Sequence, residues 1–165
     1  MILHHPLAAA VCAGFIAGTV ATFAQMLLWW IEGTPVIATL LRDARLTAAV
    51  VMGPGVLHHA PGWRWDVLIW ATAIHFTLSV IYALIAWPVA RAMTLSAAIG
   101  LGALYGAAIY VINLHGFTHV FPWFDVSRGW VTTLAHLVFG ASLFAGCAVL
   151  AHRLRHPRRL GRPGR

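Results

Sequence analysis

Charged side chains are scarce in this sequence. Only 9% of its 165 residues are Asp, Glu, Lys or Arg, the carboxylates number four, and lysine is absent. A soluble domain of this length needs far more polar surface, because most of its exterior faces water. The mean hydropathy of +0.81 agrees with this scarcity. Together these values exclude an ordinary soluble globular domain.

The familiar sequence motifs of enzymes are also missing. The chain has no glycine-rich nucleotide loop, no Gly-x-Ser-x-Gly elbow and no carboxylate pair suited to hydrolysis. No Asp or Glu lies in the middle of a long apolar run, which removes the carboxylate that proton-coupled exporters usually carry. We therefore expect a protein that is not an enzyme and has no catalytic residues.

Cysteine is limited to Cys12 and Cys147. Each lies about five residues from the end of an apolar run that is predicted below to face the cytoplasm. A reducing compartment argues against a structural disulfide. We interpret both cysteines as small, buried apolar side chains.

The chain does contain four long apolar segments, at residues 7–30, 67–90, 95–114 and 129–151. Each has about the 20 residues needed to cross a hydrocarbon core of roughly 30 Å. The sequence therefore predicts an all-α membrane protein, with residues 1–151 forming one domain of four transmembrane helices. Gly14 and Gly18 in the first segment, and Gly102 and Gly106 in the third, have the four-residue spacing that permits close helix approach.

Residues 35–52 form a helical pattern of a different kind. Arg42, Asp43 and Arg45 lie in the middle of this segment, which argues against a further crossing. The pattern favours an interfacial amphipathic helix between the first and second spans. We expect Thr34 to be its N-cap and Pro35 its first helical residue. The apolar positions at helical spacing are Val36, Ile37, Leu40, Leu41, Ala44 and Ala48.

Arginines are unevenly distributed among the links between these segments. Residues 152–165 hold six of the eleven, and Arg91 lies in the short link between the second and third spans. Because basic residues favour the cytoplasmic side, we predict that both termini are cytoplasmic. The all-arginine composition suggests a bacterial inner (plasma) membrane. The opposite face then holds four arginines, each with an aspartate nearby: Arg42, Arg45, Arg64 and Arg128.

The basic tail at 152–165 is rich in Pro and Gly, so we expect it to be disordered. A polybasic segment directly after a span is typical of contact with anionic lipid headgroups, and we expect no nucleic-acid partner. The arginines that we assign to this surface are Arg153, Arg155, Arg158, Arg159 and Arg162.

Ten histidines are a high number for this length, and His75 and His136 fall inside predicted spans. Each follows a charged boundary residue by eight or nine positions, which places both about 12–14 Å deep. An ionisable residue inside a span is a candidate functional residue. Imidazole binds haem iron, zinc and copper, and it changes charge near neutral pH. His115 and His119, in the link before the fourth span, complete the candidate site.

Three interpretations of these histidines are open. They can form interhelical hydrogen bonds, bind a transition metal or haem, or line a proton or solute path. The sequence thus predicts an integral inner-membrane protein of unassigned activity, with a candidate outer-face histidine site for metal or haem. The alternatives are a small transporter or channel subunit, within a homo-oligomer, and a structural or accessory membrane protein.

Four runs of the sequence resemble a family of small bacterial four-span membrane proteins. These runs are LLWWIEGTP, LLRDARLTAAVVMGPGVL, AIHFTLSVIYAL and INLHGFTHVFPWFDVSRGWVTTLAHLVFG, and the resemblance covers residues 15–143. Members often carry the label sodium:proline symporter, although symporters of that class are far longer chains with many more spans. The resemblance implies a four-span fold in a bacterial membrane and no established activity, substrate or catalytic residue.

Overall fold

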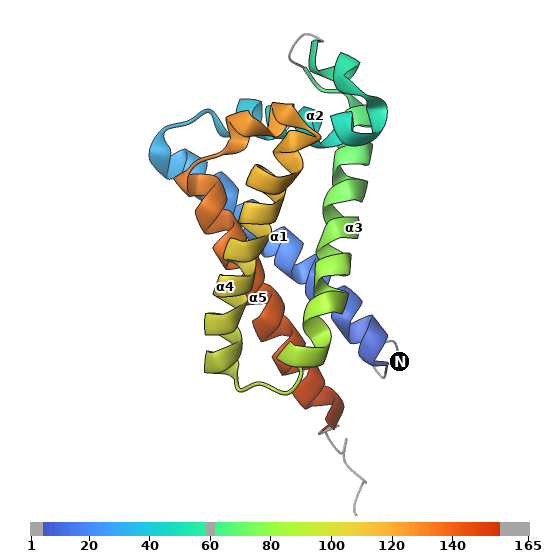
Figure 1. The fold of residues 1–165 in the computed structure, drawn as a ribbon, viewed down its shortest axis with the longest axis vertical. Coiled ribbons are helices and arrows are strands. Elements are labelled where there is room, and N and C mark those ends of the chain that lie inside the picture. Colours follow the sequence, from blue (N-terminus) through green and yellow to red (C-terminus); the bar gives the residue numbers. More distant parts are fainter. Residues whose placement is uncertain (1–4, 59–61, 156–165) are drawn as a thin grey trace, which may run out of the picture.

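The computed structural model describes residues 5–58 and 62–155, and every regular element within them is helical (Figure 1). Five α-helices account for most of these residues: α1 (Pro6–Glu32), α2 (Val36–Met52), α3 (Trp65–Ala90), α4 (Leu95–Val111) and α5 (Trp130–Arg155). Four short helical turns connect them: η1 (Pro54–His58), the π-helical η2 (Ile112–Gly116), η3 (Phe117–His119) and η4 (Pro122–Ser127).

Four of these helices are long and apolar enough to cross a membrane. They are α1, α3, α5 and the continuous stretch from α4 through η3, which runs from Leu95 to His119. This finding confirms the predicted all-α fold with four spans and is consistent with an integral membrane protein. The third span continues past its predicted end at Leu114, because η2 and η3 prolong the helix at the end of α4.

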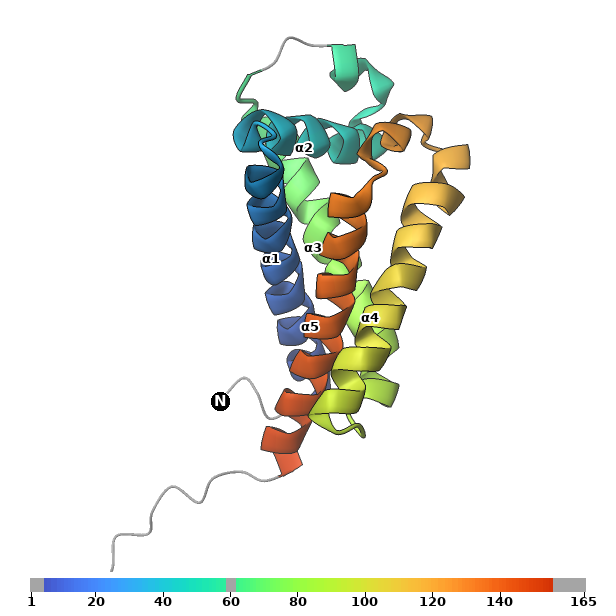
Figure 2. The same cartoon turned by 90° about the vertical axis from the view of Figure 1, so that its left-hand side faces the viewer.

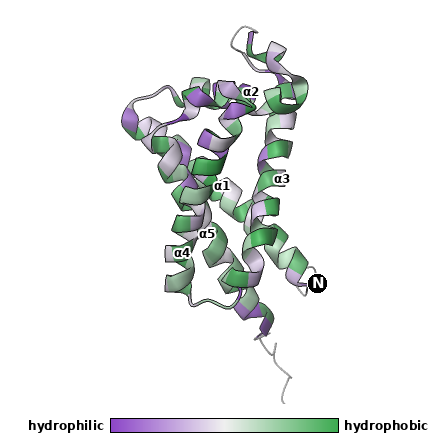
Figure 3. Cartoon of the chain, in the orientation of Figure 1, coloured by the Kyte–Doolittle hydropathy of each residue, from purple (hydrophilic) through white to green (hydrophobic). Residues whose placement is uncertain are grey.

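The two ends of the bundle differ in what covers them. We call the end at Glu32, Trp65 and Trp130 the cap end, because α2 lies crosswise over it (Figures 1 and 2). We call the opposite end, where α5 finishes at Arg155, the tail end. Hydrophilic residues concentrate at both ends, and apolar residues cover the helices between them (Figure 3).

The helix α2 begins differently from the prediction. Its N-cap residue is Pro35, and no side chain caps its first turn. The Thr34 hydroxyl does not cap this helix, and it donates a 3.0 Å hydrogen bond to Glu32 Oε2. The buried side chains of α2 are Thr39, Leu46, Ala48 and Ala49, whereas Arg42 and Val51 are exposed. Its location at a membrane surface stays a prediction.

Glycines bring α4 and α5 into backbone contact. A Cβ atom at Gly106 would collide with the carbonyl group of His136, and one at Gly140 would collide with the backbone of Gly102 and Gly106. Lipid offers no hydrophobic drive for helix association, so close van der Waals packing stabilises such a pair. The predicted role of Gly102 and Gly106 in close approach is therefore confirmed.

Small residues also bring α1 close to two neighbours. On one side, a Cβ atom at Gly14 would lie 2.8 Å from Ser79 O, and one at Gly18 would lie 3.0 Å from the His75 ring, so α1 meets α3 closely. On the other side, Ala13 faces Gly146 of α5 and is fully buried. This glycine pair, like that of α4, lies where the sequence predicted close approach.

Candidate functional site

His75 lies between α3 and α1. Its Nε2 atom is 3.3 Å from the carbonyl oxygen of Gly18 and 3.4 Å from Oγ1 of Thr22. A carbonyl oxygen can only accept, and the Thr22 hydroxyl donates to that same carbonyl at 3.0 Å. Nε2 is therefore the N–H donor in this arrangement, and Nδ1 keeps its lone pair as an acceptor.

His136 has the opposite arrangement of its ring nitrogens. Its Nδ1 lies 2.8 Å from the carbonyl oxygen of Thr132, one turn earlier in α5, so Nδ1 is the donor and Nε2 the acceptor. Within residues 5–58 and 62–155, Nε2 has no hydrogen-bond partner. Nε2 is also not completely buried. Among the described residues, the completely buried side-chain nitrogen or oxygen atom that lacks a partner is Nε1 of Trp87. The acceptor atom of His136 is thus unpartnered and not completely buried.

The structure brings two of the four predicted histidines, His115 and His136, against one shared side chain. His75 lies on α3 and makes its ring contacts with α1 and Phe76. Tyr110 of α4 packs edge-on against His136 on one side and against His115 on the other, at centroid distances of 5.6 Å each. His119 is exposed at the cap end and joins none of these contacts.

The sequence analysis missed a second group of polar side chains beside these histidines. The Tyr82 hydroxyl donates a 2.8 Å hydrogen bond to Oδ1 of Asn113, and the Tyr105 hydroxyl donates a 3.1 Å bond to the Tyr82 carbonyl. Side chains lean toward the N-terminus of their helix, so Tyr82 of α3 leans to the cap end and Asn113 leans back toward it. A signal was available, because Asn113 is the chain's single asparagine and lies in a predicted span.

Asn113 belongs to the π-helical segment η2, where the regular hydrogen-bonding of α4 changes. Such segments occur frequently at functional sites. Arg128 holds this segment in place, since its Nε donates to Leu114 O at 2.7 Å and its Nη2 donates to Thr118 Oγ1 at 2.8 Å. The π segment is therefore a fixed feature of the cap end.

Polar contacts from the loop before α5 close the cap end above these residues. Trp123 Nε1 donates a 2.9 Å hydrogen bond to Leu46 O in α2, and Trp130 Nε1 donates a 2.9 Å bond to Glu32 Oε1. Ser127 donates a 3.4 Å bond to Asp43 Oδ1. Burial raises the pKa of Asp43 above its usual 3.8, although the Arg42 charge and the hydrogen bonds from Arg42 and Ser127 oppose the shift.

The described residues form no multi-ligand metal centre at the predicted site. The described residues contain no group of three or more His, Cys, Asp or Glu side chains that could hold a metal ion. Cys12 and Cys147 are both free; Cys147 is buried as predicted, whereas Cys12 is only half-buried. Any ion at this site would therefore depend on His75 and His136 alone.

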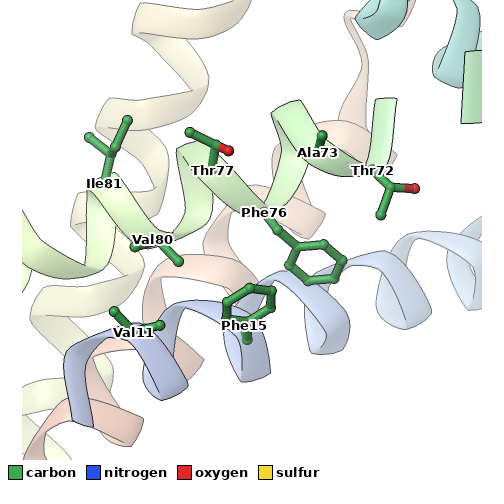
Figure 4. Close-up of a pocket in the computed structure, with 8 residues that line it drawn as sticks. All are labelled: Val11, Phe15, Thr72, Ala73, Phe76, Thr77, Val80 and Ile81. Atoms are coloured by element: carbon green, nitrogen blue, oxygen red, sulfur yellow. The ribbon is translucent and has the colours of Figure 1, made fainter. Parts of the chain in front are cut away.

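One pocket on α1 and α3 has no histidine in its lining, although the His75 ring packs edge-on against Phe76, which lines it. It is an open, apolar groove of about 540 Å³ on the outward side of α1 and α3, in which Phe15 stacks on Phe76 (Figure 4). The Thr72 and Thr77 hydroxyls lie along α3 at its rim. A groove of this composition suits lipid chains and offers no group for chemistry.

The basic tail is described only in part. Arg153 and Arg155 complete the last turn of α5, at the tail end. Arg158, Arg159 and Arg162 lie outside the described residues. At this end, Arg155 also donates a hydrogen bond to the backbone carbonyl of Arg91.

In comparisons with protein-family models, curated proteins and solved structures, nothing matches this chain. The candidate site must therefore be argued from its own geometry.

Proposed function

We propose that this chain is a non-enzymatic integral protein of the bacterial inner membrane, with a cap-end histidine site that binds a proton or a small hydrogen-bond donor. The Nε2 acceptor of His136, which has no hydrogen-bond partner among the described residues and belongs to a ring packed beside Tyr110, carries this proposal. Intramembrane ionisable residues are costly, and they usually face a cavity or a partner. The resemblance to a four-span bacterial family supports the same setting.

The proposed site lies beneath the cap and does not continue as a pore through the tail-end half. On the tail side of the histidines, the bundle centre is packed with apolar side chains, and Leu143 and Cys147 are fully buried. A packed apolar floor blocks water and ions. We therefore favour a binding site over the channel interpretation.

The proposed orientation puts the cap end outside and both termini in the cytoplasm. Arg91, Arg153 and Arg155 lie at the tail end, and four further arginines follow in the sequence, against four arginines at the cap end. A C-terminal reporter that is active only in the cytoplasm should be active. If a C-terminal reporter that works only in the periplasm is active instead, the cap end faces the cytoplasm and the site is filled from that side.

Conservative variants separate a binding site from interhelical hydrogen bonds. In His136→Asn, the amide can still donate toward Thr132 O, but the Nε2 acceptor is lost. In His75→Gln, the amide can still donate toward Gly18 O, but the Nδ1 acceptor is lost. Nitrogen-15 spectra of the imidazole rings in membrane-reconstituted protein report proton uptake by each histidine.

A shared site predicts that the two rings take up protons in a linked way, so that each variant changes the titration of the remaining ring. His119→Asn is the matched control and should leave both titrations unchanged. If the conservative variants change nothing while His136→Phe and His75→Phe destabilise additively, the histidines serve as interhelical links and the proposal fails.

Two histidines can also bind a metal ion, and one observation favours this second candidate. An Nδ1–H bond to a backbone carbonyl, as in His136, is the usual orientation of a metal-binding imidazole. Titration of the metal-free protein with Zn²⁺, Cu⁺ or haem should then show one equivalent bound. His136→Asn should abolish that binding. A colourless, metal-free preparation that binds none of the three leaves only the proton or small-ligand site.

A further inference from the structure

A second cavity lies at the tail end, where α4 begins and α5 finishes. It measures about 260 Å³, below the roughly 300–1,000 Å³ typical of pockets for drug-sized ligands. Its walls are partly apolar and partly basic, and they include Met93, Thr94, Leu95, Val149, His152 and Arg153. A cavity of this size suits a small charged group with a few attached carbons.

Charge at this end of the molecule has one sign. All four carboxylates of the chain, Glu32, Asp43, Asp66 and Asp125, belong to the cap end. At the tail end, Arg155 Nη2 donates a 2.9 Å hydrogen bond to Arg91 O, which ties the end of α5 to the end of α3. Arg153 lines the cavity, and among the described residues no Asp or Glu side chain lies at this end, so an anion from outside the chain would complete it.

The start of α4 adds hydrogen-bond donors beside Arg153. Thr94 precedes the first turn of α4, no side chain caps that turn, and the Thr94 and Ser96 hydroxyls lie 3.5 Å apart. The first backbone N–H groups of a helix have no acceptor within the helix and attract an anion. The helix start alone would not define a ligand. The cavity and Arg153, which lines it, together indicate an anionic ligand.

We propose that this cavity binds the phosphate of an anionic phospholipid, with the start of its chains against Met93, Leu95 and Val149. Its location supports a lipid as the ligand, since the cavity lies where two apolar helices end and a basic segment follows, a typical place for anionic headgroups. Free phosphate would use the guanidinium and the hydroxyls but not the apolar wall. This site is independent of the cap-end histidines.

The test compares Arg153→Gln with Arg91→Gln in the full-length protein. Both variants remove one charge from the tail end, but the Arg91 side chain does not line the cavity. Binding of phosphatidylglycerol is measured by thermal shift and native mass spectrometry in detergent, with phosphatidylcholine as the neutral reference. Delocalised attraction to the surface would cost each variant about fivefold in affinity at low salt. At about 1 M NaCl, where the Debye length is about 3 Å, that attraction is screened.

The cavity predicts that, in high salt, Arg153→Gln binds phosphatidylglycerol about tenfold or more weakly than wild type, whereas Arg91→Gln binds it normally. Thr94→Val should weaken binding by a smaller factor. Equal losses in Arg153→Gln and Arg91→Gln would overturn the proposal. It also fails if millimolar glycerol 3-phosphate or inorganic phosphate protects the protein as well as the lipid does. Thermal stability without lipid should match wild type in all three variants, which separates lost binding from lost folding.

Discussion

The two halves of this bundle are held together by different interactions. In the tail-end half, alanines, Leu143, Phe144 and Cys147 are buried against one another, and the charges are all basic. In the cap-end half, Tyr110, His115 and His136 come together from α4, η2 and α5 under a lid of α2 and η4, and Asn113 bonds to Tyr82 of α3. Van der Waals packing alone can stabilise the first half. The second half also depends on hydrogen bonds, and a ligand or a proton can take the place of one partner in such a bond.

The largest expected effect comes from a substitution in the α4–α5 contact, which both halves share. Gly106→Ala places a methyl group against the His136 carbonyl and should destabilise the protein by about 3 kcal/mol or more. Gly100→Ala is the matched control, because a Cβ atom there meets nothing within 4 Å. Thermal unfolding in detergent should therefore separate the two variants strongly. Equal stability would contradict the close backbone contact.

Shortening a buried side chain in the tail-end half should have the next largest effect. Leu143 is fully buried, so Leu143→Ala removes packing that lipid cannot replace and should cost about 2 kcal/mol. Leu104 is 69% exposed, and Leu104→Ala should cost little. The histidine spectra should stay unchanged in Leu143→Ala if the two halves are independent. A change in them would show that the packed floor shapes the cap-end site.

Opening the cap tests the other half. Trp123→Phe removes the indole donor to Leu46 O and should weaken the contact between η4 and α2 by about 1 kcal/mol. Hydrogen exchange should rise in residues 36–52 and stay unchanged in the tail-end half. Trp63, which is 63% exposed, supplies the control Trp63→Phe. Unchanged exchange in α2 would mean that Trp123 does not hold the cap closed.

A double-mutant cycle measures the polar link between α3 and α4. Tyr82→Phe and Asn113→Leu each remove one partner of the 2.8 Å hydrogen bond, and their coupling energy should be about 0.6 kcal/mol, a typical value inside membranes. Unfolding equilibria of the two single variants and the double variant give this energy. Purely additive effects would show that the cap-end half does not depend on this bond.

The smallest expected effect concerns the pH dependence of the cap. Because burial raises the folded-state pKa of Asp43 above 3.8, its contribution to stability is full below pH 3.8 and is lost as pH rises through the folded value. Asp43→Asn keeps an acceptor for Ser127 and should stabilise the cap by about 0.5 kcal/mol or less at neutral pH. The free energy of unfolding should depend less steeply on pH in this variant than in wild type. An unchanged slope would assign it to other groups.

The sequence by itself determined the four spans and the glycine pairs that bring helices together. Apolar length and residue size fix these features locally, whatever the neighbouring helix is. It also singled out His75 and His136, because an ionisable residue in a span is visible without a structure. Only the tertiary structure decided their partners, since the contacts of His75 with Gly18 and of His136 with Tyr110 join residues far apart in the chain.

The same distinction explains what was missed. Tyr82 and Asn113 are 31 residues apart and meet only because α3 and α4 run in opposite directions, with their side chains leaning toward each other. The start of α2 depended on whether Thr34 bonded to the helix or to Glu32, a choice that local sequence leaves open. His119, which fitted the site by spacing, lies apart from it because the helix changes to π and then 3-10 geometry between His115 and His119. Local patterns therefore determined which segments are helical, while helix packing decided which polar atoms found partners.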